Sequence, residues 1–132
     1  MSDADRLAGG AAGGLSIAVE SVGGRAVVLH LAGELDMVTA PGFAEQVQHH
    51  VTDRDDEGRS IALILDLSGI TFLGSAGLAV LAEARNLALA RAVNVRVVAQ
   101  SRTVLRPMEV TGLDKVLTVV PDVATAIEQV GE

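Results

Sequence analysis

Hydrophobic residues alternate with polar or small residues over two short segments near the start of the chain. Residues 15–20 read Leu-Ser-Ile-Ala-Val-Glu, and a second segment, residues 25–32, also places three of its apolar residues on one face. A period of two is typical of a strand that buries one face. Gly23 and Gly24 separate the segments, and paired glycines favour the tight turn of a hairpin. The pattern therefore predicts an antiparallel β-hairpin.

The following segments change from helical spacing to a continuous apolar run. Phe43, Val47 and Val51 are four residues apart, which predicts a helix with one buried face. Pro41 suits the first turn of this helix, because the N–H group that proline lacks has no partner there. Residues 61–65 are all apolar and are bounded by polar residues, as expected for a strand that is covered on both faces.

The remaining pattern completes an α/β fold. We expect, in order, an Ala- and Leu-rich helix over 75–91, a strand over 93–99, a short helix from Ser101 to Gly112 that Pro107 kinks or shortens, an edge strand over 116–120 and a last helix from residue 121. Strands joined through helices pair in parallel by right-handed crossovers. The prediction is a single domain with a mixed sheet of four or five strands, backed by about four helices. Residues 1–14 are expected to form a flexible leader, and residues 15–132 the domain.

The composition of the chain argues against several classes of function. The chain has 132 residues, a formal net charge of −7, no cysteine and only two aromatic residues, Phe43 and Phe72. A strongly acidic chain disfavours binding to nucleic-acid phosphates and to anionic membranes, and single-strand binding also needs aromatic platforms. The absence of cysteine excludes disulfides and thiolate metal sites. With no secretory signal and no apolar run of about 18 residues, we expect a cytoplasmic protein without nucleic-acid or membrane partners.

Ser75 is the candidate functional residue. It stands where a predicted strand and turn give way to the long helix, between the small residues Gly74 and Ala76. At about 100° per residue, Ser75 shares a stripe with Ala79 and Glu83, and small or polar side chains on one stripe predict exposure to solvent. A phosphate on Ser75 would meet free backbone N–H groups and the positive end of the helix dipole. The alternative is that Ser75 only caps the helix.

A serine hydrolase is the enzymatic alternative. The nucleophile elbow requires G-x-S-x-G, but Leu73 occupies the first glycine position. The three histidines, His30, His49 and His50, all precede Ser75 and lack an evident orienting aspartate. His49 and His50 point about 100° apart on the predicted helix, whereas a two-histidine metal face needs i, i+4 spacing. We therefore expect surface histidines, no enzymatic activity, no cofactor and no metal.

Three carboxylates at predicted connections each have two interpretations. Glu34 and Asp36 lie where residues 33–36 are expected to leave the second strand in a loop, and they could bind a cation or shape the turn before the helix. Asp66 is expected to end a buried strand, where ligands often bind in α/β sheets, or to cap the next turn.

Three segments with this element order resemble the STAS domain family. Residues 31–40, Leu-Ala-Gly-Glu-Leu-Asp-Met-Val-Thr-Ala, resemble its xGELDxxTA segment, and residues 65–78 resemble its DLSxVxFxDSSGL segment. The Thr-Gly-Leu of residues 111–113 resembles a late xGL. The likeness extends over about residues 15–130. Stand-alone members of the family are bacterial anti-sigma factor antagonists.

The resemblance implies a partner switch in transcription regulation and stress response. In the family, the unphosphorylated antagonist binds an anti-sigma factor that is also a serine kinase, which frees a sigma factor. Phosphorylation of the serine that opens the central helix, which matches Ser75, separates the pair, and a PP2C-type phosphatase reverses the modification. By the resemblance and the stripe, the partner-binding residues are expected to be Gly33, Glu34, Asp36, Thr39, Gly74, Ser75, Ala76, Ala79 and Glu83.

Two positions depart from the family motif. Gly74 replaces the usual aspartate, and Ala76 replaces a second serine or threonine, so Ser75 is the only acceptor within the motif. The alternative function is a phosphorylation-independent STAS binding module, such as a subunit of a lipid-transport ABC complex or a nucleotide-sensing domain. We expect a monomer or a weak homodimer.

Overall fold

The computed structural model describes residues 14–130 and has the predicted order of elements. The elements are β1 (Leu15–Val22), β2 (Ala26–Leu35), α1 (Ala40–Val51), β3 (Ala62–Leu73), α2 (Ser75–Arg91), β4 (Val95–Val98), α3 (Arg102–Thr111), the 3₁₀ helix η1 (Leu113–Lys115), β5 (Thr118–Val120) and α4 (Val123–Val130). The predicted α/β class is confirmed. The predicted leader falls on residues 1–13, outside the described residues, and on Gly14, whose carbonyl oxygen accepts a hydrogen bond from the Glu34 N–H at 3.1 Å.

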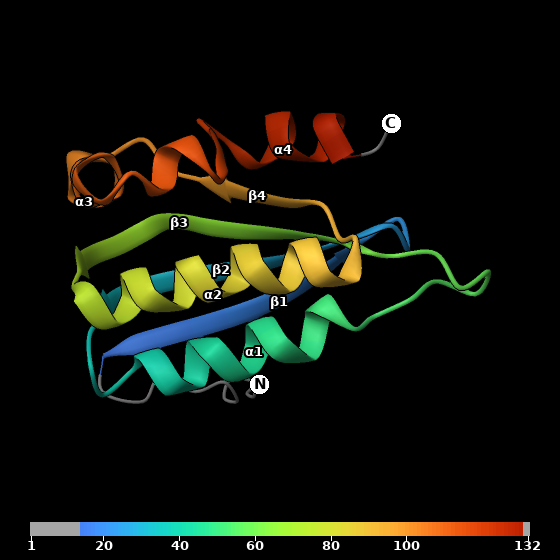
Figure 1. The fold of residues 1–132 in the computed structure, drawn as a ribbon, viewed down its shortest axis with the longest axis horizontal. Helices are drawn as coiled ribbons and strands as arrows, with labels where there is room; N and C mark the ends of the chain where they lie inside the picture. The colour runs from blue at the N-terminus through green and yellow to red at the C-terminus, as the bar shows by residue number, and fades with distance from the viewer. Residues whose placement is uncertain (1–13, 131–132) are drawn as a thin grey trace.

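The described strands form one mixed sheet in the order β1-β2-β3-β4-β5 (Figure 1). β1 and β2 are antiparallel, and each later pair is parallel. The hairpin turns at Gly23 and Gly24, whose φ angles of 58° and 68° are unfavourable for residues with a side chain. The predicted hairpin and parallel crossovers are therefore confirmed.

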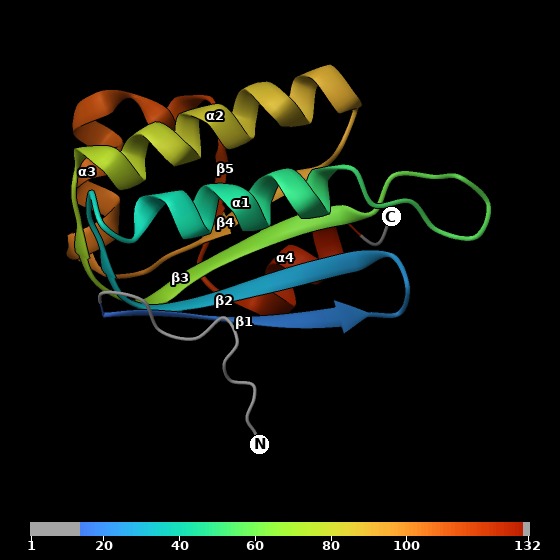
Figure 2. The same cartoon turned by 90° about the horizontal axis from the view of Figure 1, so that it is seen from below.

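Each face of the sheet carries a hydrophobic core. On one face, Leu29 of β2 and Leu65 of β3 belong to a large cluster that includes Phe43 of α1, and all three are fully buried. Figure 2 shows α1 and α2 side by side on this face. On the other face, Ile64 belongs to a smaller cluster with Ala126 of α4. Successive side chains of β3 point to opposite faces of the sheet, so this strand contributes to both cores, as expected for a strand covered on both sides.

Two strands are longer than their local pattern predicts. β2 extends to Leu35 and β3 to Leu73, and the ends of the two strands pair with each other. The expected loop at residues 33–36 is therefore wrong for its first three residues, and Asp66 lies inside β3 instead of at its end. The pairing between the strands supplies the hydrogen bonds that keep these polar segments extended.

The last third of the chain differs in smaller ways. β4 and β5 are shorter than the predicted strands, and η1 was not predicted. Pro107 lies inside α3, which continues to Thr111. The helix ends where predicted, because Gly112 adopts the left-handed conformation with φ 79°. Within residues 14–130, no helix is both long and apolar enough to cross a membrane.

Candidate functional site

The carboxyl ends of the parallel strands β2 and β3 lie side by side at one end of the sheet, and each strand is followed by a helix. The loop after β2 leads into α1, and the loop after β3 leads into α2, so the two connections lie at the same end of the molecule (Figures 1 and 2). The Gly74 N–H donates a hydrogen bond to the Leu35 carbonyl at 2.9 Å. This bond joins the two motif segments, which are far apart in the sequence, into one surface.

Ser75 is the first residue of α2, and its side chain is exposed. The N-cap is Gly74, in an extended conformation (φ −93°, ψ −178°), and no side chain caps the helix. The interpretation of Ser75 as only a helix cap is therefore wrong. The first turn of a 17-residue helix presents N–H groups that have no partner within the helix. The hydroxyl thus stands in a place that favours an added anion.

The predicted solvent-facing stripe of α2 is confirmed. Ala79 and Glu83 are exposed on the same side as Ser75, whereas Val80 and Leu81 are buried against the core. The side chain of Ala76 is half-buried and packs against the core. Ser75 therefore heads a stripe of small and polar residues that another protein can approach.

Two glycines fix how α2 sits against the end of β2. A Cβ atom on Gly77 would lie 2.8 Å from Leu73 Cδ1 and 2.9 Å from Leu35 Cβ, so a side chain there would press on the core. A Cβ atom on Gly74 would lie 3.0 Å from Cε2 of the Phe72 ring. A side chain at position 74 would therefore require the half-exposed Phe72 ring to shift by a few tenths of an ångström.

The loop after β2 is closed by hydrogen bonds between its own residues. Asp36 Oδ1 accepts from the Val38 N–H at 3.0 Å and from the Thr39 N–H at 3.1 Å. The Thr39 hydroxyl donates to the Glu34 carbonyl at 2.8 Å and accepts from the Asp36 N–H at 3.0 Å. Thr39 is only 3% exposed. Of the two interpretations of Asp36, turn shaping is therefore the one that its hydrogen bonds match.

Gly33 has a backbone role in the same region. Its φ angle is 115°, and a Cβ atom there would overlap the carbonyl oxygen of Gly14. The backbone of Gly14, which directly precedes β1, can lie this close to β2 only because Gly33 has no side chain. The side chain of the next residue, Glu34, is in contrast exposed to solvent.

Sequence reasoning did not single out three exposed apolar side chains on the two connections that lead into α1 and α2, Met37, Val38 and Phe72, which we call the apolar patch. Their exposed fractions are 82%, 72% and 51%. Met37 and Val38 project from the loop between β2 and α1, and Phe72 lies one residue before the N-cap of α2. Two consecutive apolar residues inside an expected loop were the signal that could have identified them. Grouped apolar residues on a surface often mark an interaction site.

His30 lies elsewhere, on the face of the sheet that α4 partly covers, and it has carboxylate partners. His30 Nδ1 lies 2.7 Å from Asp66 Oδ2, and His30 Nε2 lies 2.8 Å from Glu20 Oε1. The expectation that His30 lacks an orienting aspartate is therefore wrong. The Ser68 hydroxyl donates to Asp66 Oδ1 at 2.6 Å, and so it faces the carboxylate and not the imidazole. This order differs from that of a Ser-His-Asp triad, in which the imidazole takes the serine proton.

The pKa values in this network shift in opposite directions. Burial of the His30 imidazole lowers its pKa, but the hydrogen bonds with Glu20 and Asp66 outweigh burial, and the pKa is raised above 6.5. Burial raises the pKa of Asp66, but hydrogen bonds from Ser68 and His30 outweigh it, and the pKa falls below 3.8. Both shifts favour a charged imidazolium–carboxylate pair.

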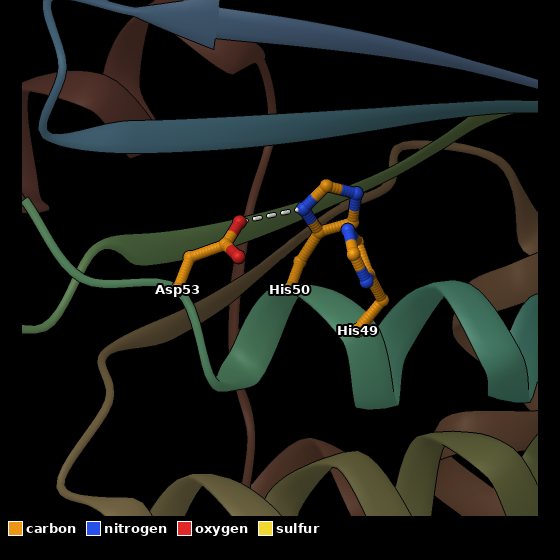
Figure 3. A group of neighbouring side chains, drawn as sticks. All are labelled: His49, His50 and Asp53. Carbon is orange, nitrogen blue, oxygen red and sulfur yellow. Dashed lines mark hydrogen bonds and ion pairs between the residues drawn. The ribbon is translucent and has the colours of Figure 1, made fainter.

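His49 and His50 do not point apart as predicted. Their ring centroids lie 4.7 Å apart in an edge-to-face arrangement, and His50 Nδ1 lies 2.8 Å from Asp53 Oδ2 (Figure 3). The His50 side chain is only 11% exposed. The expectation of surface histidines therefore holds for His49, which is exposed, and is wrong for His50, which is largely buried and paired with Asp53.

Comparisons with known proteins agree on one family. The model of the STAS domain matches residues 16–126. The chain is 39% identical to the anti-sigma-F factor antagonist RsfB of Mycobacterium tuberculosis over 88 residues, and this matched region covers 67% of each chain. The crystal structure of an anti-sigma factor antagonist from Mycobacterium paratuberculosis superposes with a TM-score of 0.78 and 35% identity, over 89% of this chain and 95% of that one. Unphosphorylated SpoIIAA of Bacillus, 19% identical, shares the fold with a TM-score of 0.70, over 88% of this chain and 95% of that one.

Proposed function

Because this chain belongs to the STAS domain family, we propose that it is an anti-sigma factor antagonist controlled by phosphorylation at Ser75. Unphosphorylated, it binds an anti-sigma factor that is also a serine kinase, and the sigma factor is released. The observation that carries the proposal is an exposed serine hydroxyl at the head of α2, beside exposed apolar side chains. The two antagonists of mycobacteria at 35% and 39% identity support it.

The binding surface consists of two kinds of residue. Glu34, Ser75, Ala79 and Glu83 are exposed and, in our proposal, contact the partner together with the patch of Met37, Val38 and Phe72. Gly33, Asp36, Thr39, Gly74 and Ala76 act indirectly in this proposal, because they shape the loop and the helix start that hold those contacts. The patch supplies the apolar surface that most interfaces bury at their centre.

Phosphorylation then acts through charge and desolvation. The kinase forms a bond between Ser75 Oγ and the γ-phosphorus of ATP while the bridging bond to ADP breaks, and the hydroxyl proton passes to a base of the kinase. The product adds a charge of about −1.5 to −2. Burying that dianion in an interface is unfavourable unless a cation pairs with it, so the complex separates. A PP2C-type phosphatase reverses the step by hydrolysis, which releases inorganic phosphate. Since ATP and sigma factors are cytoplasmic, we place the protein in the cytoplasm.

The modification itself is tested by the intact mass of the protein isolated from its own cells, with and without phosphatase treatment. Fragmentation should place one phosphate on Ser75. A chain that stays unmodified through growth, stress and stationary phase would contradict the switch and favour the phosphorylation-independent binding module.

The effect on binding is tested with Ser75→Glu and Ser75→Ala against the kinase-type anti-sigma factors of the same genome. We expect Ser75→Ala to bind within about twofold of the wild type, and Ser75→Glu to bind at least about tenfold more weakly, because the carboxylate is buried in the interface. Titration calorimetry measures both. The matched control is Ser21→Glu, at another exposed serine, in β1 near the hairpin turn, which should bind like the wild type. Equal affinities of the wild type and Ser75→Glu would overturn the proposal.

A further inference from the structure

Three potential metal ligands gather at the carboxyl end of α1, away from Ser75. His49 and His50 lie in the last turn of α1, and Asp53 follows the C-cap residue Thr52 (Figure 3). Both α1 and α2 run in the same direction along the sheet, so this cluster and Ser75 lie at opposite ends of the molecule (Figures 1 and 2). The partner surface proposed above does not include it.

The geometry of the cluster is close to that of a metal site. One ligand atom from each of the three residues lies within 4.8 Å of the others. Ligand atoms about 2.0–2.1 Å from a tetrahedral ion lie about 3.3 Å from one another, so side-chain rotations that move these atoms by up to about 1.5 Å complete the site. His50 and Asp53 are already 2.8 Å apart, and partial burial restricts both. His49 is exposed and can rotate toward them.

The local field favours a cation at the same place. The carbonyl groups at the end of a helix carry partial negative charge, and no lysine or arginine lies in the last turn of α1. The loop that follows contains Asp55, Asp56 and Glu57, and it also contains Arg54, whose guanidinium donates a hydrogen bond to the Asp53 carbonyl at 2.9 Å. Arg59 forms ion pairs with Asp55 and with Glu57, at 2.8 Å in each case, so its positive charge is already paired within the loop.

We propose that His49, His50 and Asp53 bind one divalent transition-metal ion of the Zn²⁺ class, with water completing the coordination shell. Two imidazoles and a carboxylate suit Zn²⁺, Ni²⁺ or Cu²⁺, whereas Mg²⁺ and Ca²⁺ prefer sites made only of oxygen. The ion links the last turn of α1 to the loop at residues 52–61, and it therefore stabilises this end of the protein.

The composition of the chain makes the site easy to isolate by mutation. The chain has no cysteine and one further histidine, His30. Both ring nitrogens of His30 are engaged, with Asp66 at 2.7 Å and with Glu20 at 2.8 Å, on opposite edges of the ring. The carboxylates around His30 therefore do not converge with it on one point, and His30 serves as the control histidine.

The test is equilibrium dialysis of the untagged full-length chain against Zn²⁺, with the bound metal counted by mass spectrometry. We expect one equivalent in the wild type, and a dissociation constant raised at least about tenfold in His49→Ala and in Asp53→Ala, since loss of even an outer-shell partner typically weakens binding that much. Gln48→Ala, an exposed neighbour on the same turn, and His30→Gln should bind like the wild type.

Thermal unfolding supplies a second readout. The midpoint temperature of the wild type should rise with Zn²⁺ concentration and that of His49→Ala should not, because a ligand stabilises only the state that binds it. Mg²⁺ should have no effect on either protein. Less than one equivalent of bound Zn²⁺ in the wild type, equal binding by His49→Ala, or loss of binding only in His30→Gln would each overturn the proposal.

Discussion

Gly77 determines how closely α2 approaches the ends of β2 and β3. Its Cβ position is blocked by Leu73 at 2.8 Å and by Leu35 at 2.9 Å, and both of these side chains are buried. The start of α2, and with it the position of Ser75, therefore depends on a residue two positions away that has no side chain. Gly42 of α1 is the opposite case, because a Cβ atom there meets nothing within 4 Å.

At this scale we predict opposite effects for two Gly→Ala substitutions. Gly77→Ala should lower the free energy of unfolding by about 1–2 kcal/mol, because overpacking the core costs more than the gain in helix propensity. Gly42→Ala should raise it by about 0.4–1 kcal/mol. Urea unfolding followed by circular dichroism measures both values. If Gly77→Ala were as stable as Gly42→Ala, the close contact would have no energetic effect.

At the scale of elements, one row of side chains connects three strands on the face that α4 partly covers. Glu20 of β1, His30 of β2 and Asp66 of β3 lie side by side, with distances of 2.8 Å and 2.7 Å between the paired atoms. Antiparallel β1 is an edge strand, so this row adds side-chain contacts to its backbone pairing. The pairs are partly exposed, and solvent therefore weakens their contribution.

This row predicts a pH-dependent stability. The pKa of His30 is raised in the folded protein, so its contribution is fully present below about pH 6.5 and is lost as the pH rises through the folded pKa. The pKa of Asp66 is lowered, so its contribution is present above about pH 3.8 and is lost as the pH falls through its folded pKa. The difference in unfolding free energy between wild type and His30→Gln should therefore be larger at pH 5.5 than at pH 8.5. Urea unfolding at both pH values measures it, and a difference independent of pH would contradict the charged pair.

At the scale of the whole molecule, the sheet separates two cores of unequal size. The large core joins α1, α2 and α3 to one face, and the small core joins α4 to the other. Ile64 and Leu65 are consecutive residues of β3, both fully buried, and each belongs to a different core. The short helix α4 therefore covers part of the protein's hydrophobic interior, and its packing contributes to the stability of the fold.

We predict that Ile64→Ala lowers the free energy of unfolding by about 2–5 kcal/mol, the range for truncating a fully buried aliphatic side chain. The control, Val19→Ala, truncates a side chain of β1 that is 51% exposed and should cost less than about 1 kcal/mol. Both values come from urea unfolding. A cost below 1 kcal/mol for Ile64→Ala would mean that α4 does not cover the sheet as described.

The sequence by itself determined the features that depend on neighbouring positions along the chain. The alternation in residues 15–20 and the pair Gly23–Gly24 define the hairpin, and the apolar run at residues 61–65 defines a strand with two buried faces. The exposed stripe below Ser75 also follows from the helical period alone. Local periodicity suffices in each case, because burial of one face repeats with the geometry of the element.

Only the tertiary structure decided the features that join distant segments. β2 continues to Leu35 because β3 supplies its hydrogen bonds, and His30 finds Asp66 at a separation of 36 residues. The exposed patch of Met37 and Val38, and the approach of His49 to His50, depend on which neighbours fill the space around a side chain. Sequence spacing gives the direction of a Cα–Cβ bond, whereas side-chain rotations and strand pairing determine what the side chain finally contacts.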